Sequence, residues 1–271
     1  HPMFVGQDHS WFKTLADSIP LEDESERKKR KAEKYLEYEV LETIPALIHT
    51  ELDAALRKNQ MCRAAYLASE ELLITWLLIL PWRQRNLREC RLGGKQPNIF
   101  RGKISPFSDI DKPAWVVEEE ARDPEAEFWQ IHFTPAETKT KVEVRAVLPK
   151  QLIEPLEKYL TKFRPELLNA KATVNLFLNR QGRAMAASSI RNIVEKWTFR
   201  CGGVRMNPHQ ARDSFAFRWL KEHPRDFLLL SKILWHRNIQ TTIQIYGSRF
   251  NVSSGMCALE EWLDEREARS K

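Results

Sequence analysis

Glycine is scarce in this chain of 271 residues, which contains 9 Gly beside 14 Pro and 9 Trp. Neither of the glycine-rich phosphate loops, G-x-G-x-x-G and G-x-x-x-x-G-K, occurs in the sequence. These loops place free backbone N–H groups against the phosphates of a nucleotide. The sequence therefore gives no support to an enzyme that uses ATP or a dinucleotide.

Cysteine is also rare, with four residues spread over the whole chain. They are Cys62, Cys90, Cys201 and Cys257. No two of them form a C-x-x-C pair, so the pattern predicts no zinc site and we expect no bound metal. Scattered thiols of this kind are typical of proteins that stay reduced, which favours a cytosol-like compartment.

Long apolar runs are missing as well. The best candidate for a membrane span, residues 72–80, has about half of the length that a bilayer requires. Glu71 precedes this run and Pro81 follows it, so we interpret it as a buried helix. We therefore expect a cytoplasmic protein that makes no contact with a membrane.

The charge of the chain is unevenly distributed. The sequence has 43 Lys and Arg against 37 Asp and Glu, a net charge of +6. Residues 171–250 alone hold 14 basic and 4 acidic side chains, whereas residues 251–271 hold 3 basic and 5 acidic ones. A basic region of this size favours a polyanionic partner such as nucleic acid. With 42% hydrophobic residues, the chain is also expected to fold as a globule.

Hydrophobic periodicity predicts a mainly α protein with one small three-stranded antiparallel β-sheet, an α+β arrangement. Helices are expected over residues 38–58, 63–80 and 152–163, and through most of the chain after residue 188. Strands are expected over residues 99–104, 128–133 and 142–148. Residues 22–34 are highly charged and mixed in sign, which is typical of a linker or an exposed helix.

A predicted helix start carries the first candidate site. Asn207 is a favoured N-cap, and Pro208 fits the first helical position. His209 then lies in the first turn, and Arg212 lies one turn further along the same face. The N-terminus of a helix favours an anion because of its free N–H groups and positive dipole. An H-x-x-R pattern alone is weak, and a surface His and Arg would otherwise be the preferred interpretation.

Four further elements accompany this pattern in a fixed order. Arg83 follows the apolar helix, and the segment TKTK at residues 138–141 places a Lys on a hairpin between two predicted strands. After the H-x-x-R pattern come LWH at residues 234–236 and YG at residues 246–247. Each element has an ordinary structural explanation, but all of them in this order are far less common.

The combination resembles the tyrosine recombinase (phage integrase) family, most specifically in residues 234–247, LWHRNIQTTIQIYG. The resemblance covers residues 38–250. It implies the catalytic-domain fold of that family for residues 38–271, including a C-terminal helix at residues 256–266. Residues 1–37 then correspond to a linker that would follow an N-terminal DNA-clamping domain.

The resemblance also implies which residues are catalytic: Arg83, Lys139, His209, Arg212, His236 and Tyr246. Lys141 remains an alternative to Lys139, since a shift of two residues keeps the same face of a strand. Three residues close in sequence to these catalytic positions depart from the family's pattern, namely Asn86, Asp213 and Trp235. None of these departures removes a catalytic group, so we expect an active enzyme.

The implied reaction is an attack by Tyr246 on a DNA phosphodiester. Two Arg side chains would grip the non-bridging oxygens, and His236 would donate a hydrogen bond to one of them. Because a Tyr hydroxyl has a reference pKa of about 10, it needs a base, and His209 is expected in that role. A Lys would protonate the 5′ leaving oxygen. The 3′-phosphotyrosyl product stores the bond energy, so no cofactor is expected.

We therefore expect a site-specific recombinase, an integrase of a bacterial or phage mobile element. It would act on double-stranded DNA at the nucleoid as a synaptic tetramer, with the C-terminal helix docked on a neighbouring protomer or on its own domain. A type IB topoisomerase-like or telomere-resolving strand transferase shares the chemistry and is the nearest alternative. An inactive DNA-binding regulator on the same scaffold is a further alternative.

Overall fold

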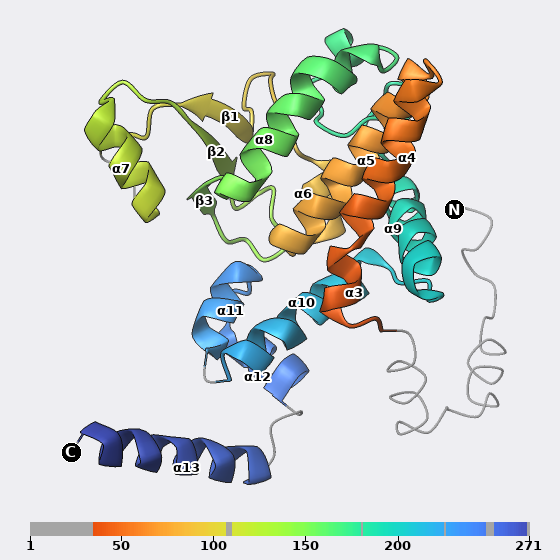
Figure 1. Ribbon diagram of the computed structural model, residues 1–271. Coiled ribbons are helices and arrows are strands. Elements are labelled where there is room, and N and C mark those ends of the chain that lie inside the picture. Colours follow the sequence, from red (N-terminus) through yellow and green to blue (C-terminus); the bar gives the residue numbers. More distant parts are fainter. Residues whose placement is uncertain (1–34, 107–109, 180, 225, 248–251, 270–271) are drawn as a thin grey trace, which may run out of the picture. The chain divides into compact units, whose positions relative to one another are not determined.

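The computed structural model describes residues 35–106, 110–179, 181–224, 226–247 and 252–269 (Figure 1). The chain separates into two units, His1–Tyr35 and Leu36–Lys271. Nearly all of the first unit lies outside the described residues, and with it most of the N-terminal segment predicted at residues 1–37. The second unit contains the elements that follow.

The described part opens with four helices: α3 (Tyr38–Glu42), α4 (Ile44–Arg57), α5 (Met61–Ile79) and α6 (Gln84–Arg88). The sequence predicts one helix over residues 38–58, but the structure divides it at Thr43. Pro45, near the N-terminus of α4, explains the division, since Pro fits a first helical turn but interrupts a helix interior.

Helix α5 is the central helix of this group and packs against α4 (Figure 1). Most of its Ala and Leu side chains are buried, together with Trp76. It ends at Ile79, and the next residue, Leu80, has the extended backbone that is favoured before a proline, here Pro81. Among the described residues, no helix combines the length and the apolarity needed to cross a membrane.

The sheet has three antiparallel strands in the order β1 (Ile99–Gly102), β2 (Phe128–Phe133) and β3 (Val144–Val147). Ile131 on the central strand pairs with Ile99 on one side and with Ala146 on the other. The predicted bounds of β2 agree with the structure, while β1 and β3 are shorter than predicted. Helix α7 (Ala114–Arg122) lies in the β1–β2 connection and was not predicted, because its apolar residues 114–117 are consecutive and show no helical spacing.

Helices form most of the rest of the chain. The predicted helix at residues 152–163 is α8 (Lys150–Lys158) followed by a π-helical turn, Tyr159–Phe163. Short 3₁₀ turns follow at Arg164–Glu166 and Ala170–Ala172. The remaining helices are α9 (Ala187–Gly202), α10 (Pro208–Glu222), α11 (Phe227–Ile233), α12 (Ile239–Tyr246) and α13 (Val252–Arg269). The expected fold class, mostly helical with a small antiparallel sheet, is confirmed.

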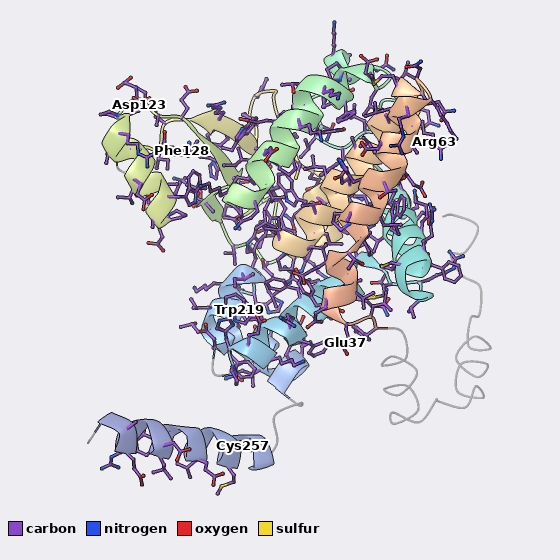
Figure 2. All side chains as sticks on the ribbon, in the orientation of Figure 1. Glu37, Arg63, Asp123, Phe128, Trp219 and Cys257 are labelled. Carbon is purple, nitrogen blue, oxygen red and sulfur yellow. The ribbon has the colours of Figure 1, made fainter. Side chains whose placement is uncertain are left out.

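Aromatic side chains fill the space where the sheet meets the helices. The ring of Trp82 lies 5.6 Å from that of Trp76, 5.4 Å from Phe133 and 4.8 Å from Trp235, measured between centroids. Figure 2 shows how densely side chains occupy the interior, with Phe128 buried and Asp123 exposed. The cluster matters for the site because Trp82 and Trp235 each precede a predicted catalytic residue.

Candidate active site

Arg83 lies between two structural elements, directly after the Pro81–Trp82 pair and directly before α6. Trp82 is buried, so the backbone on which Arg83 stands is fixed by the aromatic cluster. The Arg83 side chain is itself partly buried, and this burial lowers its pKa from the usual value for arginine. The guanidinium therefore stays close to the protein interior instead of extending into water.

Asn207 is the N-cap of α10 and Pro208 its first residue, as the sequence predicts, and the structure adds a complete capping box. The side-chain oxygen of Asn207 accepts hydrogen bonds from the N–H groups of His209 (2.9 Å) and Gln210 (3.0 Å). The side chain of Gln210 accepts one in return from the Asn207 N–H at 2.9 Å. This local structure fixes His209 in the first turn, where its side chain is exposed. Arg212, one turn later, is only 2% exposed.

The guanidinium of Arg212 joins three segments of the chain. It donates hydrogen bonds to the carbonyl oxygens of Pro81 and Leu234, and it lies 3.2 Å from Nε2 of His236. Burial, followed by the neighbouring charge of Arg83, lowers the pKa of Arg212 to about 10. The group thus remains positively charged at neutral pH, and its orientation is set by backbone atoms.

His236 supports Arg212 as a neutral side chain. An arginine can only donate, so Nε2 of His236 accepts and Nδ1 carries the proton, which it donates to Oγ1 of Thr242 at 2.8 Å. Burial and the charges of Arg212 and Arg83 lower the pKa of His236 to about 4. The imidazole is therefore uncharged over the physiological range.

Tyr246 is the last residue of α12 and is only 1% exposed. Its ring meets Phe217 edge to face, with 5.4 Å between the centroids. Its hydroxyl donates a hydrogen bond to Oδ1 of Asp213 at 2.9 Å, and Asp213 is itself 3% exposed. Tyr246 also influences the pKa values of Arg83 and Arg212, so it belongs to the same electrostatic cluster.

Asp213 is the residue of this cluster that the sequence analysis missed. In the sequence, Asp213 stands out only as a departure from the family's pattern at the position after Arg212. Its partner Tyr246 lies 33 residues further along the chain, and no spacing rule connects positions that far apart. Its place immediately after a predicted catalytic Arg was the one available signal.

Lys139 reaches the site from the hairpin between β2 and β3. A cavity of about 550 Å³ opens beside the buried cluster. Its lining residues are Trp82, Arg83, Gln84, Arg85, Lys139, Arg191, Asn207, Pro208 and His209. Among the described residues, the hairpin contributes only Lys139 to this lining. Lys141 has a left-handed backbone, with a φ of 57°, and its N–H donates back to the Thr138 carbonyl at 3.3 Å.

The base of this hairpin is held by Glu137. Its carboxylate accepts hydrogen bonds from the N–H and the hydroxyl of Thr134, both at 2.8 Å, and from Arg91 and Asn98. Burial acts to raise the pKa of Glu137, but these hydrogen bonds outweigh that effect and lower the pKa to about 2. The carboxylate therefore stays ionised and anchors the turn that carries Lys139.

All six predicted residues are thus assembled around one place. Arg83, Lys139 and His209 line the cavity, and Arg83 and His209 also lower the pKa of His236 through their charges. Arg212, His236 and Tyr246 form the buried side of the same cluster. Four cationic side chains and no carboxylate are found among the described residues that line the cavity. Such a site attracts an anion of the size of a phosphodiester.

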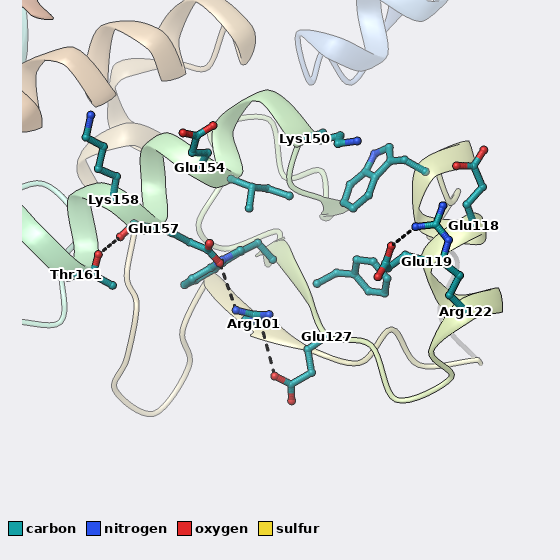
Figure 3. A pocket seen from close by; sticks show the side chains of 14 residues that line it. Arg101, Glu118, Glu119, Arg122, Glu127, Lys150, Glu154, Glu157, Lys158 and Thr161 are labelled. Atoms are coloured by element: carbon teal, nitrogen blue, oxygen red, sulfur yellow. Dashed lines mark hydrogen bonds and ion pairs between the residues drawn. The ribbon is translucent and has the colours of Figure 1, made fainter.

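A second and larger cavity, of about 860 Å³, lies between α7, the first two strands and α8 (Figure 3). Its charged residues pair with one another: Arg101 lies 3.2 Å from Glu157, and Arg122 lies 3.4 Å from Glu119. Carboxylates that form no ion pair within the described part of the chain, such as Glu118, would also repel a phosphate. The cationic cavity is therefore the better candidate for a phosphate site.

Metal-ligand geometry gives no competing candidate. Within the described ranges, no group of three or more His, Cys, Asp or Glu side chains is arranged to hold a metal ion. The four cysteines are unpaired thiols; Cys90 is buried, and Cys62 and Cys257 are exposed. The chemistry available at the site is therefore that of the arginines, the lysine, the histidines, the aspartate and the tyrosine.

Comparison with known proteins agrees with this geometry. Residues 121–251 match the model of the Phage integrase family, a range that includes every predicted catalytic residue except Arg83. The tyrosine recombinase XerD of Staphylococcus epidermidis is 33% identical over 96 residues, and that of Staphylococcus aureus is 34% identical over 101 residues. Each alignment covers 35% of this chain and 32% of the relative. The aligned part thus spans about a third of these relatives.

Among solved structures, the fold resembles that of the XerH site-specific recombinase bound to its difH substrate in a pre-cleavage complex. The TM-score is 0.53 with 19% sequence identity, and the match covers 84% of this chain and 54% of the other. The match extends well beyond the range of the family model, and it identifies the fold.

Proposed function

We propose that this chain, whose residues 121–251 match the model of the Phage integrase family, is a site-specific DNA recombinase that works through a 3′-phosphotyrosyl intermediate. One observation carries the proposal. A buried Tyr, Tyr246, shares an electrostatic cluster with two arginines, and that cluster borders a cationic cavity. The family supplies the 3′ polarity of the bond.

The arginines would act on the phosphate. Attack on phosphorus builds negative charge on the non-bridging oxygens, and Arg83 and Arg212 would stabilise that charge with paired N–H donors. The backbone carbonyls of Pro81 and Leu234 hold the Arg212 guanidinium in place before DNA arrives. Neutral His236 reinforces the same orientation, and His209 approaches the phosphate from the cavity wall. Removing one positioned donor of this kind typically costs about 3–4 kcal/mol of barrier height.

The bond changes involve Tyr246 and Lys139. The Tyr246 oxygen forms a bond to phosphorus while the bond from phosphorus to the 5′ oxygen breaks. Lys139, on the cavity side, donates a proton to the departing 5′ oxygen, which becomes a hydroxyl. The phosphotyrosyl link conserves the energy of the phosphodiester, so a second 5′ hydroxyl can reverse the reaction and seal the strand.

The first test is covalent capture of DNA. We predict that the protein, incubated with a library of nicked duplexes, forms denaturant-resistant adducts whose DNA ends identify the preferred site. The matched control is Tyr246→Phe, which removes the nucleophilic oxygen and keeps the ring packed on Phe217. It should bind the same DNA with unchanged affinity and give no adduct.

Three outcomes would contradict the assignment. An adduct formed by Tyr246→Phe at the rate of the unmodified protein would exclude Tyr246 as the nucleophile. DNA binding by the unmodified protein without any adduct would favour a regulator instead. Relaxation of supercoiled plasmid by the monomer without recombinant products would favour the topoisomerase-like alternative.

We further propose that the protein acts on double-stranded DNA as a tetramer in the cytoplasm of a bacterium, as an integrase of a mobile element. The support for self-association comes from α13. Four apolar residues of this helix each expose more than two fifths of their surface to solvent: Met256, Leu259, Trp262 and Leu263. A helix with such a face is stabilised by docking, and a second copy of this chain is the proposed partner.

A further inference from the structure

The Tyr246 hydroxyl has a defined hydrogen-bond acceptor. It donates to Oδ1 of Asp213 at 2.9 Å, and both side chains are almost fully buried, at 1% and 3% exposure. A hydrogen bond of this length and burial fixes the direction of the O–H bond. The phenolic proton therefore points at a carboxylate rather than at water.

Helix α10 provides both the acceptor and the packing for the phenol. Asp213 and Phe217 are four residues apart and so lie on one face of the helix. Phe217 contacts the Tyr246 ring, and Ala216 packs in the same apolar cluster. Burying the Asp213 carboxylate would be costly in isolation, but the adjacent Arg212 guanidinium compensates for it electrostatically.

His209 occupies a different position. It is exposed and lines the cavity, where a phosphate can be reached directly. Tyr246 is closed off from solvent, so its proton has to pass to a group that is buried with it. Asp213 is in hydrogen-bond contact with that proton in the structure.

We propose that Asp213 is the proton acceptor for Tyr246 during strand cleavage. This inference rests on the proposed function. As the Tyr246 oxygen forms its bond to phosphorus, the O–H bond breaks and the proton moves to the Asp213 carboxylate. The bond to the 5′ oxygen breaks with its electron pair, and Lys139 supplies the proton for that oxygen. In religation both protons return, so the site ends with its original charges.

If Asp213 only restrained the Tyr246 hydroxyl and did not accept its proton, replacing Asp213 would change the cleavage rate in the opposite direction. A carboxylate that accepts the phenolic hydrogen bond stabilises the neutral phenol relative to the phenolate. Replacing it with Asn, which is nearly isosteric and uncharged, therefore favours the phenolate in either case. If Asp213 only restrains Tyr246, cleavage becomes faster; if Asp213 takes the proton, cleavage becomes slower.

The experiment measures both quantities in Asp213→Asn. Single-turnover adduct formation on a nicked duplex selected from the library should fall about 100-fold or more, as expected on loss of a general base. The pKa of Tyr246, followed by NMR with ¹³Cζ-labelled tyrosine, should fall in the same variant. The matched control is Asp226→Asn, whose side chain makes no capping hydrogen bond at the start of α11. It should leave both quantities unchanged.

The outcomes separate this inference from the proposed function. If the unmodified protein forms no adduct, the recombinase proposal fails. If the unmodified protein cleaves and Asp213→Asn cleaves as fast or faster, only the role of Asp213 is overturned. Should Asp213→Asn be unstable, Asp213→Glu decides the question, because it retains a carboxylate. A folded Asp213→Glu variant as inactive as Tyr246→Phe would contradict proton transfer to this position.

Discussion

Lys139 and Lys141 lie two residues apart on one hairpin, but only Lys139 is among the described residues that line the cationic cavity. We predict that Lys139→Ala slows cleavage about 100-fold or more, because the 5′ oxygen leaves poorly without a proton. A substrate with a 5′-thiolate leaving group needs little protonation. It should restore the rate of Lys139→Ala but not that of Arg212→Ala, since Arg212 acts on the non-bridging oxygens.

The matched control for this test is Lys141→Ala, which removes the same charge from the same turn. Its cleavage of the ordinary substrate should stay close to that of the unmodified protein. If the thiolate instead rescues a defect of Lys141→Ala alone, the general acid is Lys141, two residues further along the hairpin.

His236 gives the protein a pH-dependent stability. Its pKa is about 4 in the folded chain and about 6.5 when unfolded, so the unfolded state binds more protons between these values. The contribution is fully present above pH 6.5 and is lost as the pH falls toward 4. We predict that, from pH 7 to pH 5, the unmodified protein loses roughly 1–2 kcal/mol more stability than His236→Gln. Urea unfolding of both proteins at the two pH values measures this difference. Equal losses would mean that His236 is not held neutral.

At the scale of elements, three rings connect the segments that carry the catalytic residues. Trp235, directly before His236, packs on Trp82, directly before Arg83, with 4.8 Å between the centroids. It also lies 5.7 Å from Phe133, the last residue of the strand that leads into the Lys139 hairpin. Trp235 has a φ of 51°, a left-handed conformation that is unfavourable for residues other than Gly. The packing of the rings compensates for that backbone cost.

This arrangement predicts an unusual order of stability. Trp235→Ala should lose about 2–4 kcal/mol through lost aromatic packing. Trp235→Gly loses the same ring but adopts the positive φ without strain, so it should be more stable than Trp235→Ala by about 1 kcal/mol. Thermal or urea unfolding of the two variants would measure the difference. Trp235→Ala proving the more stable of the two would contradict the strain argument.

Sequence alone predicts those elements whose signals are local. The Asn207 N-cap and the strand at residues 128–133 are each indicated by a few adjacent residues, and both agree with the structure. The contact between Tyr246 and Asp213 depends on how α12 packs on α10, which no local pattern encodes. Helix α7 was not predicted because it has only nine residues and its apolar residues 114–117 are consecutive, so they show no helical spacing.

For the whole molecule, charge distinguishes the region proposed to face DNA from the C-terminal helix. Residues 171–250, which include His209, Arg212 and His236, carry most of the excess positive charge, whereas residues 251–271 are net acidic. On the proposed function, DNA would repel this net acidic helix, which leaves its exposed apolar side chains for protein contact. The predicted helix at residues 256–266 lies within α13, which is longer and extends from Val252 to Arg269.

We therefore predict that deletion of residues 252–271 weakens cooperative binding to two-site DNA more than it weakens binding to one site. Titration of both duplexes by band shift measures the two affinities. Ser253, near the start of α13, offers a matched control, since Ser253→Ala leaves the apolar residues in place and should keep the cooperativity. Equal losses on one-site and two-site DNA, or unchanged cooperativity after deletion, would mean that the helix packs on its own chain. If α13 also restrains Tyr246 of the neighbouring protomer, the deletion should release this nucleophile without assembly. Uncoupled cleavage of single sites should then increase.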